Sequence, residues 1–213
     1  MAHEVSRHSE IMMLLAYSGL RWGEMAALRP RDVDLARGRI DIVRSASKVN
    51  SQSIMVSPKT WERRTVAIPT EVAKMLEPIV EAAPTTESLL WSRPDGTPLR
   101  PPTTTHWLSK AVTRLVERSD EKDPFPRVTA HELRHTAASL MIASGAHVKT
   151  VQRQLGHKSA TMTLDLYGHL FDDDLDAVAT RMGKGLRLAA VNGVLTECGQ
   201  NVGTKGGAVE SIA

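Results

Sequence analysis

The chain has 213 residues, of which 41% are hydrophobic and 24% charged, and this suits a globular protein with one core or two small ones. A formal net charge of +3 permits a polyanionic partner without requiring one. The single cysteine, Cys198, excludes an internal disulfide framework. No apolar run reaches the ~20 residues of a membrane span, and no signal peptide pattern opens the chain. We therefore expect a cytoplasmic protein with no membrane partner.

The first third of the chain predicts two helices and a small sheet. Apolar residues at helical spacing predict a helix over 9–20 that Gly19 closes, and a short helix follows over 23–28. Alternating apolar and polar residues predict strands over 39–44 and 64–68, with which 53–56 could pair. This pairing places Lys59 in the turn of a hairpin, after Pro58.

The remainder predicts helices joined by polar loops. A capping box, Thr129-x-x-Glu132, opens a helix that ends at Gly145. Other helices are predicted over 70–81, 103–117, 148–155, 160–170 and 172–181, with loops over 84–102 and 119–127. From Gly183 the chain is rich in glycine and weakly periodic. We predict an α+β, mostly helical domain over 1–182 with a small three-stranded antiparallel sheet, and a flexible tail over 183–213.

Five short segments carry residues that could perform chemistry on a phosphodiester. Their candidate side chains are Arg21 with Glu24, Lys59, His131 with Arg134, His157, and Tyr167. A phosphodiester transfer through a tyrosine adduct needs cations for the non-bridging oxygens, a proton donor, a proton acceptor and a nucleophile. The five segments together supply all four.

Each candidate also has an ordinary structural explanation when it is taken alone. Arg21 could be a surface arginine paired with Glu24, and Lys59 could be a solvated turn residue. Tyr167 could pack half-buried, and it would need help as a nucleophile because a free phenol has a pKa near ~10. The other tyrosine, Tyr17, lies inside the first predicted helix, where we expect it to belong to the core.

The segment from His131 to His135 also fits the H-E-x-x-H pattern of zinc hydrolases, which places two imidazoles on one helix face. A third ligand is then required. The extended pattern needs glycine and histidine where this chain has Ala138 and Met141, and no glutamate lies between Glu132 and Glu197. A zinc hydrolase is therefore the weakest of the alternatives, and we expect neither a metal nor another cofactor.

In order and spacing, the five segments resemble the catalytic domain of the tyrosine recombinase (phage integrase) family. The similarity runs from about Ser18 to Leu170, and the stretch from Leu155 to His169 is especially like phage and prophage integrases. The resemblance implies the fold of the DNA breaking-rejoining enzymes. It also implies site-specific recombination of double-stranded DNA, with no small-molecule substrate and no metal.

The resemblance further implies a role for each candidate residue. Tyr167 would attack the scissile phosphate and become a 3′-phosphotyrosine, while Arg21 and Arg134 would hold the non-bridging oxygens. Lys59 would protonate the leaving 5′ oxygen. His131 would act as a base and also hydrogen-bond the phosphate. His157 would donate a hydrogen bond to the phosphate, and Glu24 would be a carboxylate that positions other side chains.

Members of this family usually carry an N-terminal core-binding domain and act as a tetramer on DNA. Because the motifs begin at Ser18, we expect this chain to lack that domain and to bind DNA weakly and with a strong dependence on salt. An alternative follows from the same observation, namely a catalytically inactive DNA-binding remnant of a truncated prophage integrase.

Overall fold

The computed structural model describes residues 2–49, 52–56, 63–103, 106–171, 179, 180, 182–184, 186 and 187. Within this part of the chain no helix is long and apolar enough to cross a membrane. Residues Met1–Phe171 form one compact unit. The predicted helix over 172–181 and the tail beyond it lie almost wholly outside the described residues, so the boundary after residue 182 stays a prediction.

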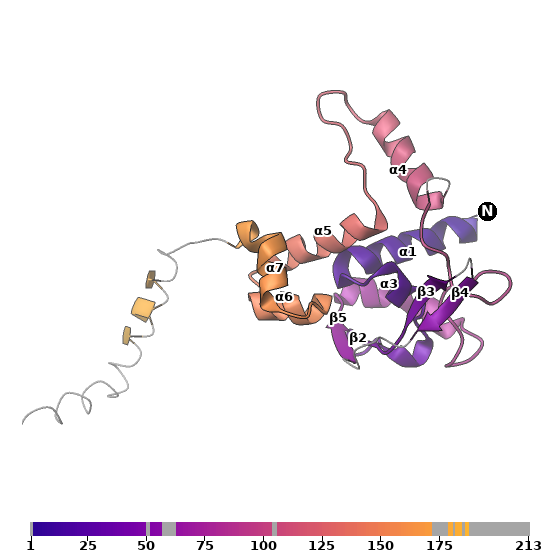
Figure 1. The fold of residues 1–213 in the computed structure, drawn as a ribbon, viewed down its shortest axis with the longest axis horizontal. Helices are drawn as coiled ribbons and strands as arrows, with labels where there is room; N and C mark the ends of the chain where they lie inside the picture. Colours follow the sequence, from indigo (N-terminus) through magenta and orange to yellow (C-terminus); the bar gives the residue numbers. More distant parts are fainter. Residues whose placement is uncertain are drawn as a thin grey trace, which may run out of the picture. The chain divides into compact units, whose positions relative to one another are not determined.

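The core is built around two helices that lie side by side, α1 (Ala2–Ser18) and α5 (Ala130–Ala143) (Figure 1). The residues predicted to face inward from α1, among them Ile11, Leu14 and Leu15, are at most 1% exposed. Gly19 follows with a φ of 70°, a left-handed conformation that favours glycine. The predicted first helix and its glycine end are therefore confirmed, but the helix begins at Ala2, seven residues earlier than predicted.

A three-stranded antiparallel sheet lies on this core, in the order β1 (Val33–Asp34), β2 (Arg39–Ile42), β5 (Arg64–Ala67). Ile40 pairs with Val66 across β2 and β5, and both side chains are 0% exposed. Two of these strands were predicted from their alternation. The third, β1, has only two residues, which is too short to show a period of two.

The predicted pairing of residues 53–56 with this sheet is wrong. These residues belong to β4 (Gln52–Val56), which pairs with β3 (Ser45–Val49) in a separate two-stranded sheet with Ser45 opposite Val56. Strands that follow one another closely in sequence pair at little entropic cost, and this local pairing prevails. Lys59 lies outside the described residues.

Four further helical segments complete the N-terminal and middle parts: α2 (Trp22–Met25), the 3₁₀ helix η1 (Pro30–Asp32), α3 (Thr70–Glu81) and α4 (Trp107–Arg118). The helix predicted from 103 begins four residues later, and α4 buries Leu108 and Val112. After α4, the predicted polar loop extends away from the core before the chain returns to α5 (Figure 1).

The capping box predicted at the start of α5 is confirmed. The Thr129 hydroxyl accepts a hydrogen bond from the Glu132 backbone N–H at 3.3 Å, and the Glu132 carboxylate accepts one from the Thr129 backbone N–H. This cap fixes the first residue of the helix. As a result, His131 lies in the first turn and Arg134 one turn later on the same face.

The described part of the unit ends with α6 (Val148–Leu155), α7 (Ala160–Tyr167) and the 3₁₀ turn η2 (Gly168–Leu170). Together with α5 they enclose a second small core, made of Ala138, Ile142, Val151, Leu155 and Tyr167. The helix predicted to reach residue 170 changes to a 3₁₀ turn after Tyr167, whose φ of −130° is not helical. Tyr167 is thus the last residue of α7.

Candidate functional site

Three of the predicted site residues line one cavity. Arg21 comes from the turn between α1 and α2, and His131 and Arg134 come from the first turns of α5. They line a cavity of about 650 Å³, which is closed on other sides by Trp22 and Pro101. Segments more than 100 positions apart in the sequence therefore meet at a single opening.

Arg134 is held from beneath by the backbone. Its side chain is 4% exposed, and its guanidinium donates hydrogen bonds to the carbonyl oxygens of Gly19 and Leu155, at the ends of α1 and α6. A guanidinium has five N–H donors, so three of them remain for a ligand. Burial, together with the charge of Arg21, lowers the pKa of Arg134 to about 10, and the group stays positively charged at neutral pH.

Arg21 is held differently, by a carboxylate. Its side chain is 51% exposed, and its Nη1 donates to Glu24 Oε1 at 3.2 Å. The Arg21 backbone N–H also donates to Glu24 Oε2 at 2.8 Å. Glu24 therefore fixes both the turn and the side chain of Arg21.

A further arginine, Arg64, completes this arrangement and was not among the predicted site residues. Its Nη1 and Nη2 donate to the two oxygens of Glu24 at 2.8 and 2.7 Å, which is a bidentate ion pair. Burial raises the pKa of the Glu24 carboxyl, but the hydrogen bonds and charges of Arg64 and Arg21 outweigh this and leave the pKa below its usual value. We call Arg21, Glu24, Arg64 and Arg134 the cationic cluster.

Arg64 also lies against the glycine that ends α6. A Cβ at Gly156 would lie 2.9 Å from Cδ, Nε and Cζ of Arg64, and Gly156 has a φ of 66°. Glycine is thus required here both for the left-handed turn and for the close approach of the guanidinium. Because His157 follows directly, Arg64 connects the position of Glu24 to that of His157.

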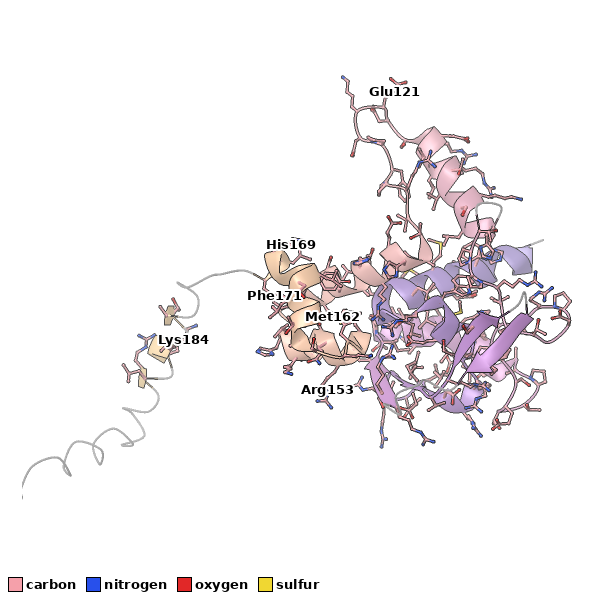
Figure 2. The ribbon with its side chains drawn as sticks, in the orientation of Figure 1. Glu121, Arg153, Met162, His169, Phe171 and Lys184 are labelled. Carbon is pink, nitrogen blue, oxygen red and sulfur yellow. The ribbon has the colours of Figure 1, made fainter. Side chains whose placement is uncertain are left out.

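The cationic cluster continues into a second cavity of about 530 Å³ between β5 and the end of α6. On one side it is lined by Arg64 in β5 and by Arg63 just before that strand. On the other side it is lined by Arg153 in α6 and by Lys158 in the turn that follows. Figure 2 labels Arg153, whose exposed side chain projects from α6. Cationic side chains from separate elements therefore border two adjoining cavities that share Arg21.

His157 is buried and neutral at physiological pH. Its side chain forms a hydrogen bond between Nδ1 and Thr163 Oγ1 at 3.0 Å, and the residue is 9% exposed. Burial, followed by the charges of Arg134, Arg21 and Arg64, lowers its pKa to about 4. A neutral imidazole so placed can hydrogen-bond a ligand oxygen through its other nitrogen.

Tyr167 is the more buried of the two tyrosines. It is 4% exposed, whereas Tyr17 is 40% exposed. The prediction that Tyr17 belongs to the core is wrong, because the inward face of α1 is formed by Leu14, Leu15 and Ser18.

The ring of Tyr167 lies parallel to that of His157, with the centroids 6.5 Å apart. Burial raises the pKa of the Tyr167 hydroxyl, although the charge of Arg134 acts in the opposite direction.

The hydroxyl of Tyr167 is hydrogen-bonded to Nδ1 of His135 at 2.8 Å. The ring of His135 in turn meets that of His131 edge to face, at a centroid distance of 4.9 Å. The sequence pattern suggests only one role for His135, that of a zinc ligand. The signal that could have indicated its role is its spacing, since it lies one helical turn after His131. We call His131, His135, His157 and Tyr167 the ring cluster.

The zinc alternative requires at least three ligands. No group of three or more histidine, cysteine, aspartate or glutamate side chains placed to hold a metal ion occurs within the described residues. His131 and His135 do lie on one helix face, as the pattern predicts, but Nδ1 of His135 is engaged by Tyr167.

Comparisons with known proteins agree with this architecture. The sequence profile of the phage integrase family matches residues 2–174. The chain is 29% identical over 179 residues to the ICEBs1 integrase of Bacillus subtilis (strain 168), which covers 78% of this chain and 45% of that protein. The chain therefore spans less than half the length of this curated relative.

Two solved structures share the fold. The Tn1549 transposon integrase in complex with a circular intermediate DNA superposes with a TM-score of 0.68 at 21% identity, over 84% of this chain and 58% of that one. The catalytic domain of bacteriophage HP1 integrase gives a TM-score of 0.50 at 22% identity, over 80% and 79%. The predicted fold class, a mostly helical domain with a small three-stranded antiparallel sheet, is confirmed as that of an integrase catalytic domain.

Proposed function

Because the chain belongs to the phage integrase family, we propose that it cuts and rejoins double-stranded DNA through a covalent 3′-phosphotyrosine at Tyr167. The observation that carries this proposal is the meeting of two sets of side chains. Arg21, His131 and Arg134 line one cavity, and the hydroxyl of Tyr167 is hydrogen-bonded to His135, whose ring contacts that of His131. This arrangement supports a site in which Arg21 and Arg134 hold the phosphate that Tyr167 attacks.

The cationic cluster is suited to the transition state of phosphoryl transfer. Attack on a phosphodiester builds negative charge on the non-bridging oxygens, and fixed cations stabilise that charge without reorganising. Arg134 is fixed by two backbone carbonyls and Arg21 by Glu24. We propose that both guanidiniums hold the scissile phosphate, and that Glu24 acts by positioning Arg21.

The remaining groups serve the nucleophile and the leaving group. In the proposed step, the bond between Tyr167 Oη and phosphorus forms and the bond from phosphorus to the 5′ oxygen breaks. Lys59 would protonate that oxygen, as the family resemblance implies. Neutral His157, with Nδ1 held by Thr163, would donate from Nε2 to a phosphate oxygen, and His131 would assist from the cavity wall.

The proposed partner is duplex DNA, bound as a homo-oligomer of the family's tetrameric type. Support comes from the cationic residues around both cavities and from the relative whose structure contains a circular intermediate DNA. Binding through phosphate contacts weakens as salt rises. We also propose that residues 1–182 form the catalytic domain and 183–213 a flexible tail.

Covalent trapping tests the proposal. The protein is incubated in excess EDTA with a randomised pool of nicked duplexes that lose a short fragment after cleavage, and denaturation-resistant protein–DNA bands are measured. We expect a band that Tyr167→Phe abolishes. DNA binding without any band would support the inactive remnant instead, and a band that persists in Tyr167→Phe would refute the proposed nucleophile.

A further inference from the structure

Attack by Tyr167 requires that its phenol lose a proton. Burial raises the pKa of this hydroxyl above its ordinary value, so the free phenolate is scarce at neutral pH. A base in hydrogen-bond contact with the hydroxyl would remove the proton as the new bond forms. The proton acceptor should therefore be sought among the groups that touch Tyr167 Oη.

His135 makes that contact. Its Nδ1 lies 2.8 Å from Tyr167 Oη, within the range that a proton transfer requires. The two residues come from α5 and α7, and the half-buried position of His135 fixes its ring between them. The tyrosine is thus held against a titratable group by tertiary packing, although the two residues lie 32 positions apart.

His131, to which the family resemblance assigns the role of base, meets the tyrosine only indirectly. It lies one turn earlier on α5, at the exposed start of the helix. Its ring contacts the ring of His135 edge to face, and His135 in turn contacts the ring of Tyr167 at a centroid distance of 5.5 Å. His135 therefore stands between the phenol and the cavity that His131 lines.

The surroundings of His135 keep it ready to accept a proton at neutral pH. Burial, then the neighbouring His131 and Arg134, lower its pKa, while Glu132 acts in the opposite direction. The groups that face it from the other elements are Tyr167 on α7 and His157 after α6. Because its pKa is lowered, the ring of His135 stays unprotonated to a lower pH than the ring of a free histidine.

We propose that His135 is the proton acceptor for Tyr167 in strand cleavage and the proton donor in rejoining. As Tyr167 Oη bonds to phosphorus and the 5′ oxygen leaves, the phenolic proton passes to His135 Nδ1. In the reverse step the 5′ hydroxyl attacks phosphorus and gives its proton back to the group that protonated it in cleavage. The phosphotyrosine bond breaks, and Nδ1 of His135 returns the other proton to Oη. This inference rests on the proposed strand transfer at Tyr167.

A substitution separates positioning from proton transfer. In His135→Asn the side-chain oxygen replaces Nδ1 as a hydrogen-bond acceptor for the tyrosine but cannot take its proton. The substrates are duplexes of random sequence around one fixed scissile linkage, made either with the natural 5′ oxygen or with a 5′-bridging sulfur. Sulfur leaves without needing an acid, so the second substrate isolates the nucleophile's half of the reaction.

We expect His135→Asn to slow adduct formation about 10²-fold on both substrates, the lower range for the loss of an acid–base group. Loss of an acid, in contrast, would be rescued by sulfur. Acidification should slow the wild type as His135 becomes protonated, at a lower pH than a free histidine would require because its pKa is lowered, and His135→Asn should lack this dependence. The matched control is His169→Asn, the same change at an exposed histidine two residues past Tyr167 (Figure 2), which should retain the wild-type rate.

The outcomes are distinct. A wild type that forms adduct while His135→Asn stays within twofold of its rate would overturn the role of His135 and leave the proposed function intact. A wild type that forms no adduct on either substrate would overturn the proposed function, and this inference with it. A sulfur substrate that restores the rate of His135→Asn would also overturn the assignment, because the defect would then lie with the leaving group.

A measurement on the free protein keeps the inference testable without turnover. Nitrogen-15 NMR of labelled histidines should show His135 at pH 7 with Nδ1 unprotonated and Nε2 protonated, and its Nδ1 signal should shift in Tyr167→Phe. A proton on Nδ1 at pH 7 would overturn the proposal, since that nitrogen would then donate to the phenol and could not accept from it.

Discussion

The cationic cluster and the ring cluster adjoin at Arg134, yet they are built from side chains with opposite protonation behaviour. Arg21, Arg64 and Arg134 are permanent cations, and Glu24 among them is kept ionised by hydrogen bonds from Arg64. In the ring cluster, in contrast, burial favours the neutral forms of three of the four groups. Burial lowers the pKa values of His135 and His157 and raises that of Tyr167.

The two clusters are also linked energetically. The charges of Arg134, Arg21 and Arg64 add to burial in lowering the pKa of His157, and Arg134 acts on His135 in the same sense. Cations that serve to bind a phosphate therefore also keep the neighbouring imidazoles unprotonated. The difference indicates a division of work, in which one cluster supplies charge that does not vary with pH and the other moves protons.

The largest effect is expected from Arg134→Lys. Lysine keeps the positive charge but cannot reach both the Gly19 and Leu155 carbonyls while facing a phosphate. We expect adduct formation to slow by ~10²–10³, or about 3–4 kcal/mol, with the same factor at pH 6 and pH 8. The control is Arg114→Lys on the exposed face of α4. If the ratio of the wild-type rate to the Arg134→Lys rate changed tenfold between the two pH values, the proposed difference in function between the two clusters would be wrong.

The next effect concerns the ion pair within the cationic cluster. Glu24→Gln replaces an oxygen that accepts from Arg64 with an NH₂ group and removes the charge between Arg64 and Arg21. We expect a loss of about 2 kcal/mol in the free energy of unfolding, measured by urea denaturation, against no more than about 0.5 kcal/mol for Glu77→Gln on the surface of α3.

The double variant measures the interaction free energy between Glu24 and Arg64. Arg64→Gln combined with Glu24→Gln should destabilise the protein by less than the sum of the two single changes, because each single change leaves a partner unpaired. Strict additivity would show that the bidentate contact between Arg64 and Glu24 contributes nothing to the fold.

A smaller effect is expected where the two clusters touch. Gly156→Ala forces a left-handed φ on alanine and brings its Cβ to 2.9 Å from Arg64. Gly145→Ala meets the same strain at a φ of 80° with nothing within 4 Å of its Cβ. Each should lose about 1–2 kcal/mol of stability from the strain. Only Gly156→Ala should also lose adduct formation, and equal activities would remove Arg64 from the site.

The smallest effect is the response of stability to acid. Folded His157 has a pKa of about 4, below the ~6.5 of an unfolded histidine. The unfolded chain therefore binds more protons between these values, so stability is complete above pH 6.5 and is lost as the pH falls toward 4. For one proton this amounts to at most about 1.4 kcal/mol per pH unit.

Chemical denaturation at pH 7 and pH 5.5 measures this effect. The decline should be smaller in His157→Asn than in the wild type, and unchanged in His147→Asn, whose side chain can still cap α6. An equal decline in all three proteins would show that His157 is not held neutral by the fold.

The sequence was sufficient to predict the main helices, although not all of their bounds. The capping box of Thr129 and Glu132 set the start of α5, and apolar spacing set the buried face of α1. These features depend on residues within one or two helical turns of each other. Lys59, Tyr167 and the other predicted residues were assigned by motif, and their catalytic roles stay predictions.

What the sequence did not indicate depends on contacts between distant segments. Arg64 lies in a segment whose alternating apolar and polar residues predict a strand but indicate no partner for its side chain. Its ion pair with Glu24 joins positions 40 residues apart. Gln154 bonds both Ser18 and Ala67 from the last turn of α6. The contact of His135 with Tyr167 arises from the packing of α5 against α6 and α7. Residue type and spacing do not encode such pairings.

The central claim is that Tyr167, buried in the ring cluster, is the nucleophile, although Tyr17 is far more exposed. The most direct test is mass spectrometry of the trapped protein–DNA adduct after nuclease and trypsin digestion. We predict that the nucleotide mass lies on the tryptic peptide of residues 159–181, at Tyr167. Nucleotide on the peptide that contains Tyr17, or on a residue that is not a tyrosine, would contradict it.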